Sequence, residues 1–204
     1  MTSAGMIALV PVKGLGAAKS RLADSMTAAD RAALVLDMLG HVLDTIAASK
    51  AAERMIVLTA DAEVAVFARA RGASVLFDPP ACDLNAALEH AVAALTGNAI
   101  MILPADLPRI EAADIAELAS RYATAGGVII APSQDGGTNA LCMPLPTPIA
   151  FGFGIDSAAR HAASAVAVGL PAALVNNVRI AFDVDRATDL RRLEDQPRRN
   201  RYVA

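Results

Sequence analysis

Residues 99–108 read Ala-Ile-Met-Ile-Leu-Pro-Ala-Asp-Leu-Pro, and their five leading apolar residues run into a single carboxylate, Asp106, that lies between two prolines. A short apolar run without polar alternation is typical of a strand that is buried on both faces of a sheet. Further runs of this kind, on either side of this stretch, indicate strands at residues 6–12, 55–59, 74–77, 128–131, 140–143, 172–175 and 179–183.

Segments with helical periodicity separate these runs. In the first segment, Thr27 and Asp30 have the spacing of a capping box, and apolar residues recur at helical spacing after them: Val35, Leu39, Val42, Leu43 and Ile46. Further helices are expected at residues 63–71, 84–95, 111–122, 157–168 and 188–193. Strands that alternate with helices form βαβ units. The sequence therefore predicts an α/β fold with a mostly parallel sheet covered by helices on both faces.

The length and composition indicate one soluble domain that spans residues 1–204. The chain has 18 Lys and Arg residues against 21 Asp and Glu residues, and its net charge of −3 gives no basic field for a nucleic acid backbone. No charged segment precedes the first apolar run, which disfavours a secretory signal. The longest uncharged stretch, residues 136–155, contains prolines and glycines that disfavour a membrane-spanning helix. We therefore expect a cytoplasmic protein without nucleic acid or membrane partners.

The cysteines and histidines form no recognisable motif. Cys82 and Cys142 lack the CxxC spacing and are expected to be buried or free thiols in a reducing compartment. His41, His90 and His161 are separated from one another and from the cysteines, so no zinc-type pattern is visible.

The loops after the strands should hold the functional residues, because ligands of an open parallel sheet bind outside the carboxyl ends of its strands. The loop after the first strand carries Lys13, Gly14, Lys19 and Arg21. It fits neither the Walker A pattern nor the GxGxxG pattern. A glycine loop with three cations can cradle a polyphosphate through main-chain N–H groups and point charges, although an ordinary solvated loop explains the same residues.

Carboxylates follow two of the other predicted strands. Asp106 is held at the ligand edge by its flanking prolines, where Mg²⁺ could use it. Its alternative role, capping the next helix, is disfavoured because that helix begins near residue 111. Asp183 and Asp185 are two residues apart and would share one face of a strand, although Asp185 also suits the N-cap of the last helix. If the sheet gathers all three carboxylates opposite the lysines, they form a magnesium nucleotide site.

The loop at residues 133–139 offers neutral ligand contacts. Its paired glycines allow close approach of the backbone, and Thr138 and Asn139 supply donors. An ordinary β-turn explains Asp-Gly-Gly equally well.

Several motifs, in order along nearly the entire chain, point to a known family. They are Val10-Pro-Val-Lys13, Ala18-Lys-Ser-Arg-Leu22, Leu84-Asn-Ala-Ala-Leu88, Pro104-Ala-Asp-Leu-Pro108, residues 131–141, Phe153-Gly154, Ser157-Ala-Ala-Arg-His161, Asp183-Val-Asp185 and Asp189-Leu190. Together they resemble the 2-phospho-L-lactate guanylyltransferases and their phosphoenolpyruvate-using bacterial relatives, which act in the biosynthesis of the deazaflavin coenzyme F-420. The Pro-Ala-Asp-Leu-Pro motif alone is modestly specific, whereas the ordered set is highly specific.

The resemblance implies a fold like that of the nucleotide-diphosphosugar transferases and a Mg²⁺-dependent guanylyltransferase. Such an enzyme transfers GMP from GTP to the phosphate of phosphoenolpyruvate, 2-phospho-L-lactate or 3-phospho-D-glycerate, releases pyrophosphate, and passes its product to a downstream transferase. The resemblance also implies residue roles: metal ligands Asp106, Asp183 and Asp185; nucleotide-binding residues Lys13, Gly14, Lys19, Arg21 and Asn85; acid-binding residues Thr138, Gly154 and Ser157; and catalytic residues Lys13, Lys19 and Asp106.

Two departures from the family pattern leave the acceptor open. Asp83 stands where many relatives have glycine, and residues 152–156 (Gly-Phe-Gly-Ile-Asp) are an unusual version of the glycine loop. Two rival functions also remain, a nucleotidyltransferase for molybdopterin or a sugar phosphate, and a non-catalytic nucleotide-sensing module. Three carboxylates aimed at a phosphate loop favour an enzyme, because a sensor needs fewer metal ligands.

Overall fold

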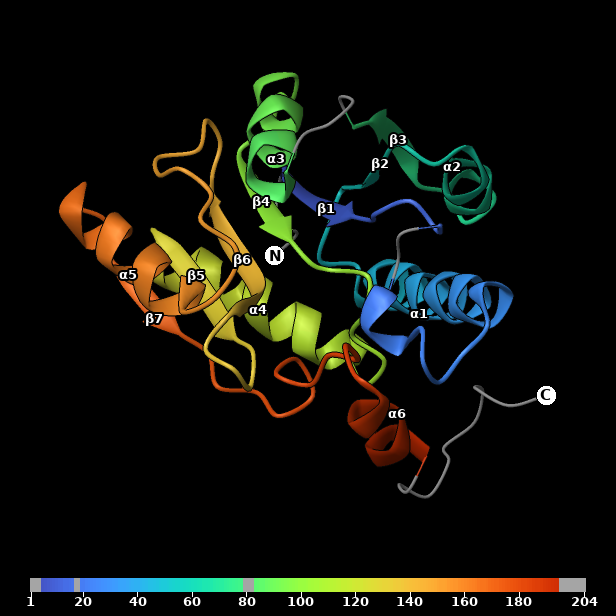
Figure 1. Ribbon diagram of the computed structural model, residues 1–204. Helices are drawn as coiled ribbons and strands as arrows, with labels where there is room; N and C mark the ends of the chain where they lie inside the picture. The colour runs from blue at the N-terminus through green and yellow to red at the C-terminus, as the bar shows by residue number, and fades with distance from the viewer. Residues whose placement is uncertain (1–4, 17–18, 79–82, 195–204) are drawn as a thin grey trace.

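The computed structural model describes residues 5–16, 19–78 and 83–194 (Figure 1). At its centre is a seven-stranded sheet in the order β3-β2-β1-β4-β6-β5-β7. The strands are β1 (Met6–Pro11), β2 (Arg54–Thr59), β3 (Ser74–Phe77), β4 (Ala99–Ile102), β5 (Val128–Pro132), β6 (Thr138–Pro144) and β7 (Ala172–Leu174). β6 is antiparallel to both of its neighbours, and the other pairs are parallel.

This strand order brings candidate residues to one edge of the sheet. All of these strands except β6 end at that edge, and β6 begins there. Lys13 follows β1, Asp106 follows β4, and Thr138 opens β6, so three neighbouring strands deliver them. The carboxyl edge is therefore where a ligand site is expected in this architecture.

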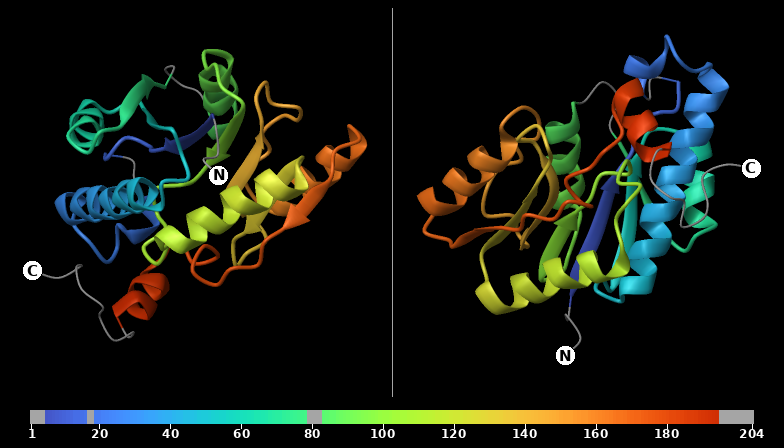
Figure 2. Two further views of the ribbon diagram at one scale, coloured as in Figure 1. Left: turned by 180° about the vertical axis from the view of Figure 1, so that it is seen from behind. Right: turned by 90° about the horizontal axis from the view of Figure 1, so that it is seen from below.

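Helices cover both faces of the sheet, as predicted (Figure 2). The helices α1 (Ala28–Ser49), α2 (Ala62–Arg69) and α4 (Ala112–Ala125) pack on one face, and α3 (Leu84–Ala93) and α5 (Ser157–Ala167) pack on the other. Alternate residues of β1 divide between the two cores, with Ala8 and Val10 on the first face and Ile7 and Leu9 on the second.

Helix α1 begins and packs as the sequence predicts. Thr27 is its N-cap, and the Thr27 hydroxyl oxygen accepts a hydrogen bond from the main-chain N–H of Asp30 at 3.1 Å. The predicted apolar stripe between Val35 and Ile46 is buried against the sheet. Within the described ranges, α1 is the one helix long and apolar enough to cross a membrane. Its packing accounts for that hydropathy as the property of a core helix.

Cys142 is a free thiol buried in β6, as expected. Burial raises its pKa to about 12, so the thiol stays protonated and unreactive at neutral pH. Cys82 lies outside the described residues.

The last helix, α6 (Ala187–Glu194), packs beside α1 and not on the sheet. Phe182 and Val184 form a small separate core with Met38 of α1, and Leu190 of α6 packs against it. Asp189 accepts hydrogen bonds from the main-chain N–H groups of Asp185 and Arg186, at 3.2 and 2.8 Å. Because α6 begins at Ala187, the N-cap position is Arg186, and the Asp185 side chain pairs with Lys19 and Arg21 instead.

The predicted strand at residues 179–183 is wrong, because residues 178–181 form a turn. The Asn177 side-chain oxygen accepts hydrogen bonds from the main-chain N–H groups of Arg179 and Ile180, at 2.9 and 3.3 Å. The Asn177 carbonyl also accepts from Ala181 N–H at 2.8 Å. An asparagine that accepts from main-chain donors two and three residues ahead closes a turn and competes with strand pairing.

Candidate active site

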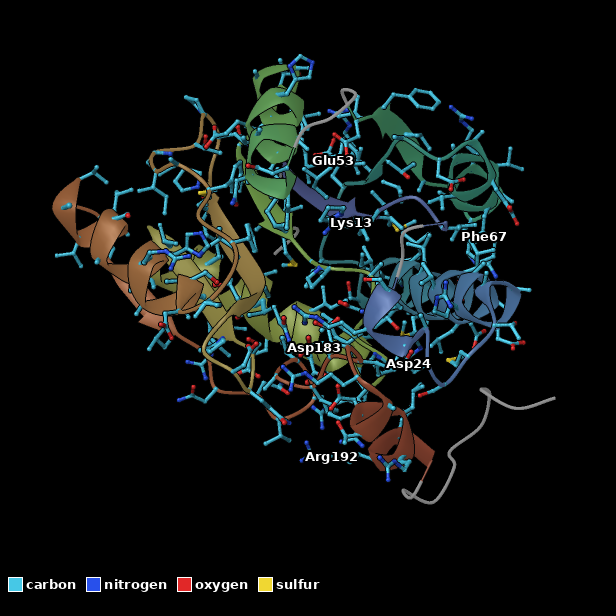
Figure 3. All side chains as sticks on the ribbon, viewed as in Figure 1. Lys13, Asp24, Glu53, Phe67, Asp183 and Arg192 are labelled. Atoms are coloured by element: carbon cyan, nitrogen blue, oxygen red, sulfur yellow. The ribbon has the colours of Figure 1, made fainter. Side chains whose placement is uncertain are left out.

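Three carboxylates meet at the edge where β4 ends. One oxygen from each of Asp106, Asp183 and Asp185 lies within 4.8 Å of the others, and all three residues are half-buried. Figure 3 shows Asp183 on the loop that leads into α6. The carboxylates therefore converge as the sequence predicts, while their role as metal ligands stays a prediction.

Hydrogen bonds outside the sheet bring these two segments together. The main-chain N–H of Val184 donates to the carbonyl of Asp106 at 3.3 Å. The buried Asn139 side chain, on β6, donates to the Ile180 carbonyl at 2.9 Å and to Asp183 Oδ1 at 3.3 Å. Asn139 was expected to offer a donor to a ligand, and instead it orients one of the three carboxylates.

Lys19 joins the carboxylates from the loop before the short 3₁₀ helix η1 (Ser20–Leu22). Its Nζ lies 2.5 Å from Asp106 Oδ2 and 2.9 Å from Asp185 Oδ1, and Arg21 Nη1 lies 3.1 Å from Asp185 Oδ2. Burial lowers the pKa of Lys19, but the charges of Asp106 and Asp185 outweigh it and raise the pKa above the ordinary value. Lys19 is thus a permanent positive charge between two carboxylates.

The acidic residues differ in how easily they ionise. Burial and the charge of Asp106 raise the pKa of Asp183 to about 6. Burial also disfavours the charged form of Asp185, but Lys19 and Arg21 hold the pKa of that carboxyl below its usual value. A divalent cation would relieve the repulsion that remains at Asp183, and oxygen ligands at this spacing suit a hard cation. The residues therefore fit a metal ion.

A cleft of about 400 Å³ opens beside the acidic residues. Its charged lining is Lys13, Lys19, Arg21, Asp106, Asp185 and Asp78. Its apolar lining is Pro11, Val12, Val35, Met38, Leu58, Leu84, Ala87, Pro104 and Ala105. Lys13 is exposed where β1 ends and makes no ion pair with the residues described (Figure 3). Cations beside carboxylates at an open cleft suit a polyphosphate bound together with a divalent ion.

One main-chain N–H group of the glycine loop after β1 is already hydrogen-bonded to another part of the protein. Leu15 N–H donates to Asp61 Oδ2 at 2.9 Å, and Asp61 Oδ1 accepts from the main-chain N–H groups of Glu63 and Val64 in α2. One main-chain donor of the expected phosphate cradle is therefore already bonded within the protein. A Cβ added at Gly14 would lie 3.6 Å from Asp61 Oδ2, so Gly14 stands directly beside this contact.

Asn85 lies next to the cleft but does not line it. Its Nδ2 donates to the Phe153 carbonyl at 3.2 Å, and its Oδ1 accepts from Phe153 N–H at 2.7 Å. Both ends of the amide thus hold the loop before α5 against α3. Its neighbours Leu84 and Ala87 reach the cleft instead. A contact between Asn85 and the nucleotide stays a prediction.

Thr138 and Ser157 lie in a buried network around His161, away from the cleft lining. Ser157 Oγ donates to Thr138 Oγ1 at 2.9 Å, and Thr138 Oγ1 lies 3.1 Å from His161 Nδ1. His161 Nε2 accepts from Gly152 N–H at 3.0 Å, so a neutral ring carries its proton on Nδ1. The Gly154 carbonyl accepts from Ser157 N–H at 3.2 Å. Contacts from Thr138, Gly154 and Ser157 to an acid substrate stay predictions.

His161 makes stability fall in mild acid. Burial lowers the pKa of His161 to about 4, so below about pH 6.5 the unfolded chain binds a proton that the folded chain does not. We expect the contribution of His161 to the unfolding free energy to fall by about 2 kcal/mol between pH 7.5 and pH 5. Urea unfolding at pH 7.5 and pH 5 measures it.

The comparison that isolates this effect is wild type against His161→Gln. Asp183 titrates in the opposite sense over the same range, because its raised pKa adds stability as the pH falls. We expect His161→Gln to lose the His161 contribution to the pH dependence, whereas the exposed control His90→Gln keeps it. Equal pH dependence in wild type and His161→Gln would show that this ring is not held neutral.

An ion pair that the sequence did not reveal supports the turn before Asp183. Asp114, on α4, is 1% exposed and accepts from Arg179 Nε at 2.8 Å, from Arg179 Nη2 and from Asn177 Nδ2 at 2.7 Å. It also accepts from Glu111 N–H at 2.9 Å, at the start of the helix. Asp114 therefore ties α4 to the segment that carries two of the site's carboxylates. The local sequence does not predict this ion pair, because an acidic residue in the first turn of a helix is common whether or not it has a distant partner.

Solved structures place this fold in a class. A protein from Desulfovibrio desulfuricans G20, assigned as a nucleotide-diphospho-sugar transferase, matches with a TM-score of 0.75 and 18% identity over 96% of this chain and 87% of that one. Glucosyl-3-phosphoglycerate synthase from Mycobacterium tuberculosis, solved with Mn²⁺ and UDP, matches with a TM-score of 0.62 and 15% identity over 85% of this chain and 70% of that one. The fold is that of the nucleotide-diphospho-sugar transferases, as predicted.

Sequence comparison identifies the family within this class. Residues 6–194 match the family described as guanylyl transferase CofC like. Phosphoenolpyruvate guanylyltransferases from Chloroflexus aggregans and Roseiflexus sp. are 37% and 40% identical, over 89% and 93% of this chain and 93% and 85% of their own lengths. A 3-phospho-D-glycerate guanylyltransferase from Phenylobacterium zucineum is 38% identical, over 89% of this chain and 86% of its own length. The chain belongs to this guanylyl transferase family.

Proposed function

We propose that this protein transfers GMP from GTP to the phosphate of phosphoenolpyruvate or 3-phospho-D-glycerate and releases pyrophosphate. The observation that carries the proposal is the convergence of Asp106, Asp183 and Asp185 beside a cleft, where two of them pair with Lys19. Membership of the guanylyl transferase family supports GTP as the donor, and the names of its relatives support the two acids.

Asp106, Asp183 and Asp185 are the residues that would hold a divalent cation, and we propose Mg²⁺. Mg²⁺ prefers one or a few carboxylates together with water and substrate phosphates, which matches this sparse oxygen set. When bound, the ion supplies positive charge for the phosphate oxygens and the leaving pyrophosphate. Lys19 and Arg21 add fixed positive charge on the same side of the cleft.

The proposed reaction is a single in-line displacement. A phosphate oxygen of the acceptor forms a bond to the α-phosphorus of GTP, and the bond from that phosphorus to the bridging oxygen of the β-phosphate breaks. The acceptor phosphate is already ionised at pH 7, so no general base is required. Lys13 and Lys19 hold the phosphates in line and balance the charge that builds on the leaving group.

The product places the protein in a reaction sequence. The product is a guanosine diphosphate ester in which a phosphoanhydride bond joins GMP to the phosphorylated three-carbon acid. A downstream transferase can break that bond, transfer the phosphorylated acid to its own acceptor and release GMP. We propose that this sequence is coenzyme F-420 biosynthesis in the cytoplasm, and that residues 1–204 act as one nucleotidyltransferase domain.

The test is a product assay with purified protein, GTP, Mg²⁺ and each acid separately, including 2-phospho-L-lactate, read by mass spectrometry. We expect pyrophosphate and a guanosine diphosphate ester from phosphoenolpyruvate or 3-phospho-D-glycerate. Chelation with EDTA should abolish the product, and added Mg²⁺ should restore it. GTP binding without pyrophosphate release from any acid would support a sensing module. Turnover only with molybdopterin or a sugar phosphate would assign a different nucleotidyltransferase.

A further inference from the structure

Asp78 is a cleft residue for which the proposed mechanism has no use. It directly follows β3, and its main-chain N–H donates to the Thr59 carbonyl at the end of β2, at 3.1 Å. Its side chain lines the cleft. One carboxylate oxygen, Oδ1, is buried and has no hydrogen-bond partner among the described residues.

An oxygen in this state indicates a missing donor. Buried polar atoms are nearly always hydrogen-bonded, because an unpaired one loses its hydration without compensation. A carboxylate is an acceptor only, so its partner must be an N–H or O–H group. Burial raises the pKa of Asp78 above the usual value. A hydrogen bond donated to the Asp78 carboxylate would lower this pKa again, because it stabilises the charged form. Because this oxygen lies at the cleft, the ligand can supply the donor.

The sheet fixes how far Asp78 lies from the phosphate-binding end of the cleft. Strand order β3-β2-β1-β4 puts Asp78 at one end and Asp106 at the other, with Lys13 between them after β1. Three strand spacings separate β3 from β4, which is about 14 Å. That distance is comparable to the reach of an extended nucleotide from its base to its phosphates. A nucleotide whose phosphates lie near Lys13 and Lys19 therefore directs its base towards Asp78.

The surroundings of Asp78 suit the faces of a base. Leu58 of β2 and Leu84 and Ala87 of α3 line the same cleft and offer apolar surface. Sites that bind small molecules combine apolar walls with a few polar groups that fix orientation. Asp78 is the acidic group on this side of the cleft, away from the cluster that contains Asp106.

Guanine offers two adjacent donors at one edge, the N1–H and the 2-amino group. A carboxylate accepts both, whereas adenine presents an acceptor, N1, at the corresponding place. We infer that Asp78 is the specificity-determining residue that accepts hydrogen bonds from the N1–H and 2-amino groups of guanine. This inference rests on the proposed function, because it names the recognition of the donor nucleotide.

The first test uses the unaltered protein and changes the nucleotide. ITP differs from GTP only in lacking the 2-amino group, so one hydrogen bond to the carboxylate is lost. We expect kcat/KM for ITP to be about 10- to 100-fold below that for GTP, because a hydrogen bond to a charged group carries that discrimination. Values within threefold of each other would overturn the inference.

The second test is Asp78→Asn, assayed with GTP, ITP and XTP. Asparagine replaces one acceptor by a donor, and xanthine carries a carbonyl where guanine carries the 2-amino group. We expect the GTP-to-ITP ratio to fall to within threefold of one, and kcat/KM for XTP to rise above that of wild type. A ratio that stays at the wild-type value, with no gain for XTP, would overturn the inference.

The matched control is Asp83→Asn, which removes a nearby negative charge. Asp83 is exposed and caps α3, with its side chain accepting from Ala86 N–H at 2.9 Å, and asparagine is an equivalent cap. Its nucleotide selectivity should equal that of wild type. A wild-type protein that forms no product from GTP overturns the proposed function. A wild-type protein that forms product, with a variant of unchanged selectivity, overturns only the assignment of Asp78.

Discussion

Asp106→Asn is expected to lower kcat for pyrophosphate release by about 10³-fold or more while the protein stays folded. Asparagine keeps the volume of the side chain but removes the charge that pairs with Lys19 and that would bind the cation. Lys19 retains Asp185 as a partner, and Asp183 loses a repulsive neighbour. The thermal midpoint should therefore be equal to or above that of wild type. Pyrophosphate release with GTP and phosphoenolpyruvate measures the activity, and circular dichroism measures the fold.

Asp24→Asn is the matched control for this prediction. Asp24 is exposed on the loop between η1 and α1 and lies in the same region of the molecule as Asp183 (Figure 3). Its loss changes the net charge by the same amount without touching the three carboxylates. We expect activity within twofold of wild type. If Asp106→Asn retains more than a tenth of the wild-type kcat, the acidic residues do not carry the reaction.

Asp114→Ala should destabilise the fold although Asp114 lies outside the cleft. The substitution removes the acceptor for Arg179, Asn177 and the Glu111 N–H in one step. Buried ion pairs cost about 3 to 5 kcal/mol to break, but Arg179 is 40% exposed and can turn to water, so we expect about 2 to 4 kcal/mol. That corresponds to a thermal midpoint about 5 to 15 °C lower. Activity should need more Mg²⁺, because the turn that positions Asp183 is loosened.

The contribution of Asp114 should disappear in acid. Burial alone would raise the pKa of Asp114, but the hydrogen bonds from Arg179 and Glu111 N–H hold it below the ordinary value. Stability from a depressed carboxyl pKa is complete above about pH 4 and is lost as the pH falls through the folded-state value. The difference between wild type and Asp114→Ala should therefore shrink below pH 4 in urea titrations.

Glu117→Ala serves as the control on the same helix. Glu117 forms an exposed pair with Arg121 one turn away, and such surface pairs contribute less than about 1 kcal/mol. An Asp114→Ala variant that unfolds within 1 kcal/mol of Glu117→Ala would show that Asp114 is not a structural tie.

The sheet was predictable because its strands are continuous apolar runs between helices, a local pattern that depends on nothing distant. The segment at residues 179–183 was not, because Ile180, Phe182 and Val184 are buried in alternation and so imitate a strand. Its turn depends on Asp114, whose hydrogen bonds to Asn177 and Arg179 span 63 and 65 residues. A pattern read along the chain contains no information about such a partner.

The sequence likewise predicts one part of the candidate site and not another. Its acidic residues could be named from strand ends and the ordered motifs, and the structure brings them together. The sequence could not show that Asp61 occupies a main-chain donor of the glycine loop, or that both ends of the Asn85 amide bind Phe153. Each of these contacts joins residues that are distant along the chain, so only the folded chain reveals which polar groups remain free for a ligand.

The ion pair between Lys19 and Asp185 joins residues that are 166 positions apart along the chain. This separation has a consequence for when a newly synthesised chain can become active. The other partner of Lys19, Asp106, lies much nearer to it along the chain. Because two of the three proposed metal ligands lie at residues 183 and 185, we expect a nascent chain to gain activity only after residue 185 has left the ribosome. Ribosome-bound chains arrested before that point should therefore release no pyrophosphate from GTP.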